Sequence, residues 1–158
     1  MSLTVEQLLA NLDLHEAVRD QSRALLQVND ETPRLAAVFG TQQRWLLGHL
    51  AMGQYFSEVA RGNPEPVILM ARYLEQVKTL GISSVNTADA FIKEMLHYNI
   101  AEYVAGGDGR THPMQPTAAT VRTFTGWVLA HLRTLDHIDG GNRLTTFLER
   151  PEMLVRLQ

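Results

Sequence analysis

Apolar residues recur at helical spacing along most of the chain, and short polar or glycine-containing segments separate one run from the next. Thr4 and Gln7 form a capping box before the first run. Ser84 is suited to begin a later helix and Gly81 to end the one before it. The patterns predict helices over residues 4–12, 13–28, 34–39, 41–61, 67–80, 84–96, 118–138 and, after a cap at Asn142, 142–148.

The helical pattern is interrupted once, between residues 99 and 117. Residues 100–104 are typical of a short strand, and residues 105–110 form a glycine-rich loop. Residues 111–116 are expected to be extended, and their two prolines predict an edge position because proline cannot donate to a ladder. The sequence therefore predicts a hairpin between the last two long helices.

The order helix, helix, glycine turn, helix, strand, loop, strand is that of a winged helix-turn-helix. In the helix after Ser84, one face is apolar and the opposite face carries Val85, Asn86, Asp89, Ala90, Lys93 and His97. We predict an all-α fold with a small β-hairpin wing. The winged helix-turn-helix spans 41–117, and residues 1–40 and 118–158 supply N- and C-terminal helices for a homodimer.

The polar groups at the start of this helix suggest contacts with double-stranded DNA. Ser84, Asn86 and Thr87 lie where backbone N–H groups favour phosphate. Asn86 could read adenine, and Val85 or Ala90 could contact a thymine methyl group. The predicted DNA-binding set is Ser83, Ser84, Val85, Asn86, Thr87, Ala90, Lys93 and, in the wing, Arg110 and His112.

Two stretches of this segment resemble the winged-helix domain of the MarR family of bacterial regulators. One is residues 81–87, continuing through Met95 and Leu96; the other is residues 108–110 followed by 114–117. In that family a wing Asp-x-Arg precedes a strand ending in Leu-Thr; here Thr117 matches the threonine and Pro116 replaces the leucine. The resemblance implies an operator-binding homodimer, with Ser84, Asn86 and Thr87 in the recognition helix, Arg110 in the wing, and a small-molecule effector near the dimer interface.

The charge of the chain argues against DNA binding. The net charge is −3, and residues 41–117 carry six basic and seven acidic side chains, whereas most DNA-binding domains are basic. A winged-helix protein-interaction module without DNA affinity is therefore the alternative, and a small-molecule sensor without DNA binding is a third class. Ser84 and Thr87 could serve only as a capping pair, and Asn86 could simply be solvated.

Other classes of function find little support in the sequence. Cysteine is absent, and no nucleophile elbow, phosphate-binding glycine loop or His-Glu-x-x-His motif occurs, so we expect neither an enzyme nor a cofactor. His131 and Asp136 are five positions apart and share no helix face, so no metal site is expected. Without a signal peptide or a run of about 18 apolar residues, the chain is expected in the cytoplasm and not in a membrane. The aromatic and methionine side chains could line a ligand pocket, a core or a dimer interface.

Overall fold

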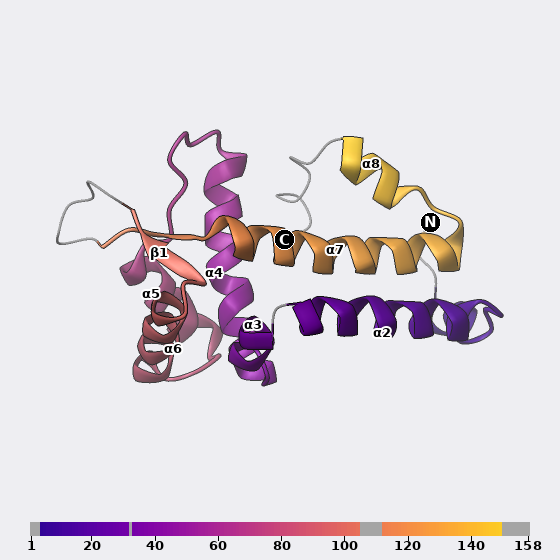
Figure 1. Ribbon diagram of the computed structural model, residues 1–158, viewed down its shortest axis with the longest axis horizontal. Helices are drawn as coiled ribbons and strands as arrows, with labels where there is room; N and C mark the ends of the chain where they lie inside the picture. The colour runs from indigo at the N-terminus through magenta and orange to yellow at the C-terminus, as the bar shows by residue number, and fades with distance from the viewer. Residues whose placement is uncertain (1–3, 32, 105–111, 150–158) are drawn as a thin grey trace. The chain divides into compact units, whose positions relative to one another are not determined.

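The computed structural model describes residues 4–31, 33–104 and 112–149, which form helices and one small antiparallel sheet (Figure 1). The coarse prediction, a mainly helical fold with a β-hairpin, is confirmed. The elements are α1 (Val5–Leu9), α2 (Leu14–Glu31), α3 (Pro33–Val38), α4 (Gln42–Ala60), α5 (Met70–Leu80), α6 (Val85–His97), β1 (Ala101–Tyr103), β2 (Met114–Pro116), α7 (Ala118–Asp139) and α8 (Arg143–Glu149). None of the helices described is both long and apolar enough to cross a membrane.

The chain divides into two compact units. The first contains α1, α2, α8 and α7 from residue 122 onward, and the second contains α3 to α6, both strands and the first residues of α7. The sequence pattern predicts that residues 33–38 belong to the N-terminal extension, whereas Val38 is part of the core of the second unit. We describe each unit by itself.

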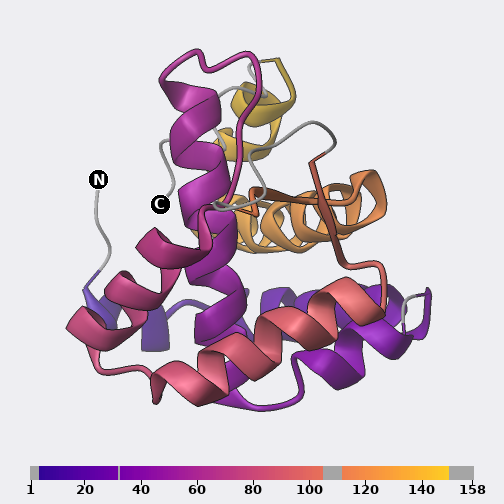
Figure 2. The same ribbon diagram turned by 90° about the vertical axis from the view of Figure 1, so that its left-hand side faces the viewer.

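Local signals set three of the helix ends in the second unit. Thr41 caps α4 by accepting a hydrogen bond from the Arg44 N–H, and Ser84 caps α6 by accepting one from the Thr87 N–H. Gly81 ends α5 at φ 65°, a left-handed conformation that glycine adopts at no steric cost. Figure 2 shows α6 leaving this turn at a steep angle to α5.

The sheet corrects two predictions. Residues 67–69 were expected to begin α5, but the Ile68 N–H donates to the Met114 carbonyl at 2.7 Å and the Met114 N–H donates back at 3.0 Å. Met114 also lies opposite Tyr103 of β1, so the expected edge position of residues 111–116 is wrong at Met114. Pro116 is tolerated because its register partner Ala101 forms a non-hydrogen-bonded pair with it, so no ladder donor is needed there.

The core of the second unit draws on α3 to α6 and on both strands. Its most completely buried side chains are Leu47, Ile68, Tyr73, Val77, Ile92, Met95 and Met114. Burial of such side chains contributes about 1.5–3 kcal/mol each. The Tyr73 hydroxyl donates to the Leu47 carbonyl at 3.4 Å, and burial raises the pKa of Tyr73, so the group stays a neutral donor. This core fixes the position of α6.

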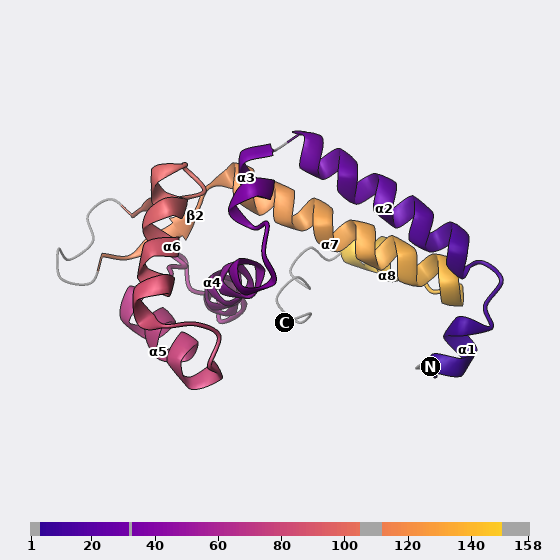
Figure 3. The same ribbon diagram turned by 90° about the horizontal axis from the view of Figure 1, so that it is seen from below.

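The first unit is built around the antiparallel pair α2 and α7, which lie side by side in Figures 1 and 3. Asn11 joins their ends by donating from Nδ2 to the Ile138 carbonyl at 2.7 Å. Few of its described apolar side chains are buried: Ala17, Val128, Leu132 and Phe147. Leu9, Leu12, Leu26 and Leu135 are instead exposed, Leu12 to 95%.

Candidate nucleic-acid interface

The two faces of α6 divide as the sequence predicted. Ala88, Phe91, Ile92 and Met95 are buried in the core. The opposite side carries the exposed residues Val85, Asn86, Ala90, Lys93 and His97, which we call the outer face of α6. A helical period of 3.6 residues explains the division, because these positions lie on one stripe. The outer face is therefore exposed to solvent and is not part of the core of its own unit.

The hydroxyl groups at the start of α6 already have partners. Ser84 Oγ accepts from the Thr87 N–H at 3.1 Å and lies 2.9 Å from Thr87 Oγ1. Ser83 Oγ donates to the Ser84 carbonyl at 3.0 Å. These contacts match the capping interpretation of Ser84 and Thr87, and they leave a further contact with phosphate untested. The Asn86 side chain makes no hydrogen bond to any described residue.

Within the described part of the chain, the two positive charges nearest the outer face, Lys93 and Arg44, are paired with carboxylates. Lys93 Nζ lies 2.6 Å from Asp89 Oδ2, one helical turn away. Hydrogen bonding and attraction to Asp89 raise the pKa of Lys93, and Tyr103 of β1 adds a smaller effect in the same direction. Arg44 Nη2, from α4, lies 2.6 Å from Glu94 Oε2.

Arg44 is a residue that the sequence analysis missed. It begins α4, while Glu94 is near the end of α6, and no local spacing connects the two. Arg44 Nε donates to the Val38 carbonyl, and the guanidinium carbon lies 5.4 Å from the centroid of the Phe91 ring. The side chain thus holds three helices together at the edge of the outer face.

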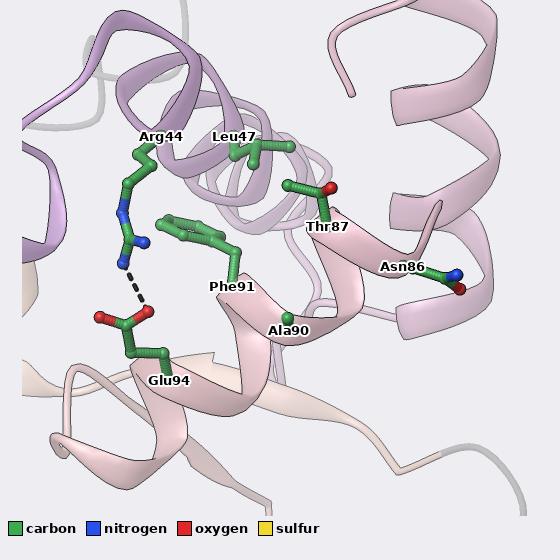
Figure 4. A pocket seen from close by; sticks show the side chains of 7 residues that line it. All are labelled: Arg44, Leu47, Asn86, Thr87, Ala90, Phe91 and Glu94. Carbon is green, nitrogen blue, oxygen red and sulfur yellow. Dashed lines mark ion pairs between the residues drawn. The ribbon is translucent and has the colours of Figure 1, made fainter. Parts of the chain in front are cut away.

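A groove of about 370 Å³ runs between α4 and α6 beside the outer face. Figure 4 shows Arg44 and Glu94 facing each other beside the Phe91 ring, with Asn86 at the opposite end. The groove is lined by Arg44, Leu47, Asn86, Thr87, Ala90, Phe91 and Glu94. It therefore joins three predicted DNA-binding residues, Asn86, Thr87 and Ala90, to an ion pair that was not predicted.

Of the two predicted wing residues, His112 belongs to the described part of the hairpin. His112 is exposed with φ 40°, and its ring centroid lies 5.9 Å from that of Tyr103. His112 therefore lies beside the end of β1. Arg110, the predicted wing cation, lies outside the described residues.

A second hollow, of about 720 Å³, lies between α4 and α5. Leucines line much of it, together with Gln54 and Gln76. None of the aromatic or methionine side chains considered for a ligand pocket lines this hollow, and Met52, Phe56 and Tyr73 are buried instead.

The acidic residues near the end of α7 have a structural role. Asp136 accepts hydrogen bonds from the Arg143 and Leu144 N–H groups at 2.9 and 2.8 Å, so it, and not the Asn142 side chain, supplies the cap of α8. Burial alone would raise the pKa of Asp136, but these bonds and the Arg143 guanidinium outweigh it and lower the pKa. Arg143 also lowers the pKa of Asp139. Across the described part of the chain, no group of three or more His, Asp or Glu is arranged to hold a metal ion.

Comparisons with known proteins leave the family open. No protein-family model matches the sequence, and no curated protein or solved structure gives a match. The geometry of α6, the groove and the hairpin is therefore the basis for a functional proposal.

Proposed function

We propose that the chain is a sequence-specific transcriptional regulator that binds double-stranded DNA as a homodimer through a winged helix-turn-helix of the MarR type. The observation that carries the proposal is the outer face of α6, which is exposed while the rest of the helix is held by a core. In a winged helix-turn-helix, α6 would be the recognition helix in the major groove and the hairpin would be the wing.

The chemistry of the outer face suits direct readout of bases. The Asn86 amide can donate and accept at once, which matches the N7 and N6 groups of adenine. Val85 and Ala90 add small apolar groups that suit a thymine methyl group. The N–H groups at the start of α6 favour a phosphate beside them, and in this proposal Lys93, Arg110 and His112 supply further positive or polar contacts.

The first unit supports a homodimer as the working form. Its exposed leucines need cover that the described residues of the unit do not supply. A two-fold pair of chains would bury them and present two copies of α6 to half-sites about 34–36 Å apart. The proposal includes a small-molecule effector only because the resemblance to the MarR family implies one.

One observation favours a protein-interaction module as the second candidate. Among the described residues, the two cations near the outer face, Arg44 and Lys93, are paired with carboxylates, so this part of the surface attracts phosphate only weakly. A groove whose two charged lining residues, Arg44 and Glu94, are paired with each other, and which Phe91 also lines, suits a peptide segment as well. The two candidates differ in how their affinity depends on salt.

A selection of bound duplexes from a random pool, followed by a salt titration of the best duplex, tests the proposal. We expect binding whose logarithm falls linearly with the logarithm of salt concentration, and a much weaker affinity for unselected duplex. Asn86→Ala should lose about 1–3 kcal/mol of discrimination at one base position. Asn142→Ala, an exposed asparagine of the first unit, is the matched control. Absence of any salt-dependent duplex binding would favour the protein-interaction module.

A further inference from the structure

The Arg44–Glu94 ion pair occupies a place where a DNA phosphate would be expected. A helix inserted into the major groove has a sugar-phosphate backbone along each flank. Glu94 lies on the flank that faces α4, in the same groove as Asn86 and Ala90 of the outer face. A bare carboxylate there would repel phosphate, and a bare guanidinium would attract it.

We propose that Arg44 is a phosphate-binding residue of the DNA interface and that Glu94 is its intramolecular competitor. The inference rests on the proposed DNA-binding function and deepens it. In free protein Glu94 holds the guanidinium; in the complex a phosphate oxygen takes the place of the Glu94 carboxylate. Glu94 thereby reduces non-specific binding, because every duplex must first compete with it.

The local contacts explain how Arg44 can change partners while it stays in place. Its Nε bond to the Val38 carbonyl and its contact with the ring of Phe91, which lines the groove, do not involve Glu94. Nη1 makes no hydrogen bond within the described residues, and the side chain is 30% exposed. Arginine presents donors in a fixed fork that suits phosphate. The guanidinium of Arg44 is therefore already held in place for binding an anion.

The alternative is that the ion pair only stabilises the packing of α4 on α6. A pair with side chains 30% and 36% exposed contributes little to stability because solvent screens it. Its removal would then change folding slightly and DNA binding only through the overall charge. The two roles are distinguished by comparing Glu94 with another carboxylate that pairs with arginine.

Glu58 provides that matched control. Its Oε1 lies 2.6 Å from Arg61 Nη1 and 3.2 Å from Arg72 Nη1, so E58Q changes the net charge as E94Q does and also releases arginines. Position 58 is about 20 Å further along the α4 axis than Arg44. The N-terminal end of α4, not this one, contributes to the groove.

The test is a salt titration of full-length wild type, E94Q, E58Q, R44Q and the double variant R44Q/E94Q on random-sequence duplex DNA. We expect E94Q to bind about three- to tenfold more tightly at low salt, with a slope steeper by about one phosphate contact. E58Q should bind as wild type does. The gain of E94Q should disappear in R44Q/E94Q, and glutamine at position 44 keeps N–H donors for the Val38 carbonyl.

Three results would overturn the inference. Equal gains in E94Q and E58Q would show a general charge effect, and a gain that persists in R44Q/E94Q would show that Glu94 acts without Arg44. If wild type binds duplex in a salt-dependent manner and E94Q binds with the same affinity, the inference about Arg44 and Glu94 is wrong but the proposed DNA-binding function still holds. If neither wild type nor E94Q binds any duplex, the proposed function fails with it. If R44Q does not fold, the comparison of E94Q with E58Q still decides.

Discussion

The two units of this chain differ in how completely they bury their apolar side chains. The second unit closes a core in which Leu47, Tyr73 and Val77 are fully buried, so its helices are held by their own neighbours. The first unit leaves large apolar side chains exposed along α1, α2 and α7, and polar contacts secure its ends. A small unit with so little burial is only marginally stable by itself. The difference suggests that one unit presents a surface for recognition and the other a surface for a second chain.

The largest expected effect comes from opening the core of the second unit. Ile92→Ala should cost about 2–5 kcal/mol in the free energy of unfolding, because it removes a fully buried side chain and leaves a cavity. Val85→Ala, on the same helix but 42% exposed, is the control and should cost far less. Urea denaturation followed by circular dichroism measures both. Similar losses for the two variants would contradict the assignment of faces on α6.

A charge on the exposed apolar surface of the first unit should act on association. Leu26 and Leu80 are 61% and 63% exposed, but Leu26 belongs to α2 and Leu80 to α5 of the second unit. If α2 forms the homodimer interface, Leu26→Glu leaves an unpaired charge there and costs about 3 kcal/mol, roughly 100-fold in the dimer dissociation constant. Leu80→Glu should leave the dimer intact. Sedimentation equilibrium reports both, and equal effects would remove the distinction between the units.

The sequence predicted well those features that depend on neighbouring residues. The Gly81 turn, the Ser84 cap and the division of α6 into two faces each follow from residues within one or two turns. Their physical causes are local: a left-handed glycine, an unsatisfied N–H and the period of the helix. The outer face, which carries the proposed function, was therefore available from the sequence.

Features that join distant parts of the chain were not predicted. Ile68 reads as the start of a helix, yet its pairing with Met114 draws it into an extended conformation. The Arg44–Glu94 pair and the capping of α8 by Asp136 likewise depend on side chains brought together by folding. Periodicity carries no information on such partners. The i,i+4 spacing of Asp89 and Lys93 is visible in the sequence, but the pairing of Arg44 with Glu94 is not.

Removing the cap of α8 tests how much polar contacts stabilise the first unit. Asp136→Ala should cost about 1–2 kcal/mol, because the Arg143 and Leu144 N–H groups lose their acceptor. Burial opposes ionisation, but the hydrogen bonds prevail and hold the folded pKa of Asp136 below its ordinary value of 3.8. The stabilisation is therefore complete above about pH 4 and is lost as pH falls through the folded pKa.

The same variant provides the pH measurement. Urea denaturation at a series of pH values should show the difference between wild type and Asp136→Ala shrinking as the solution becomes more acidic. Asp136→Asn retains one acceptor oxygen and should lie between the two at neutral pH. A difference that stays constant down to strongly acidic pH would show that the charge of Asp136 does not contribute.

The smallest expected effect compares two serine hydroxyls, one in each unit. Ser84→Ala removes the acceptor for the Thr87 N–H and should cost about 1 kcal/mol, which Ser84→Asn should largely restore. Ser22 lies within α2 and donates to the Val18 carbonyl at 2.8 Å, a bond that helices do not need, so Ser22→Ala should be near neutral. Urea denaturation distinguishes the two. If Ser84→Ala is also neutral, packing alone holds the start of α6. The capping hydrogen bond of Ser84 then does not contribute to stability.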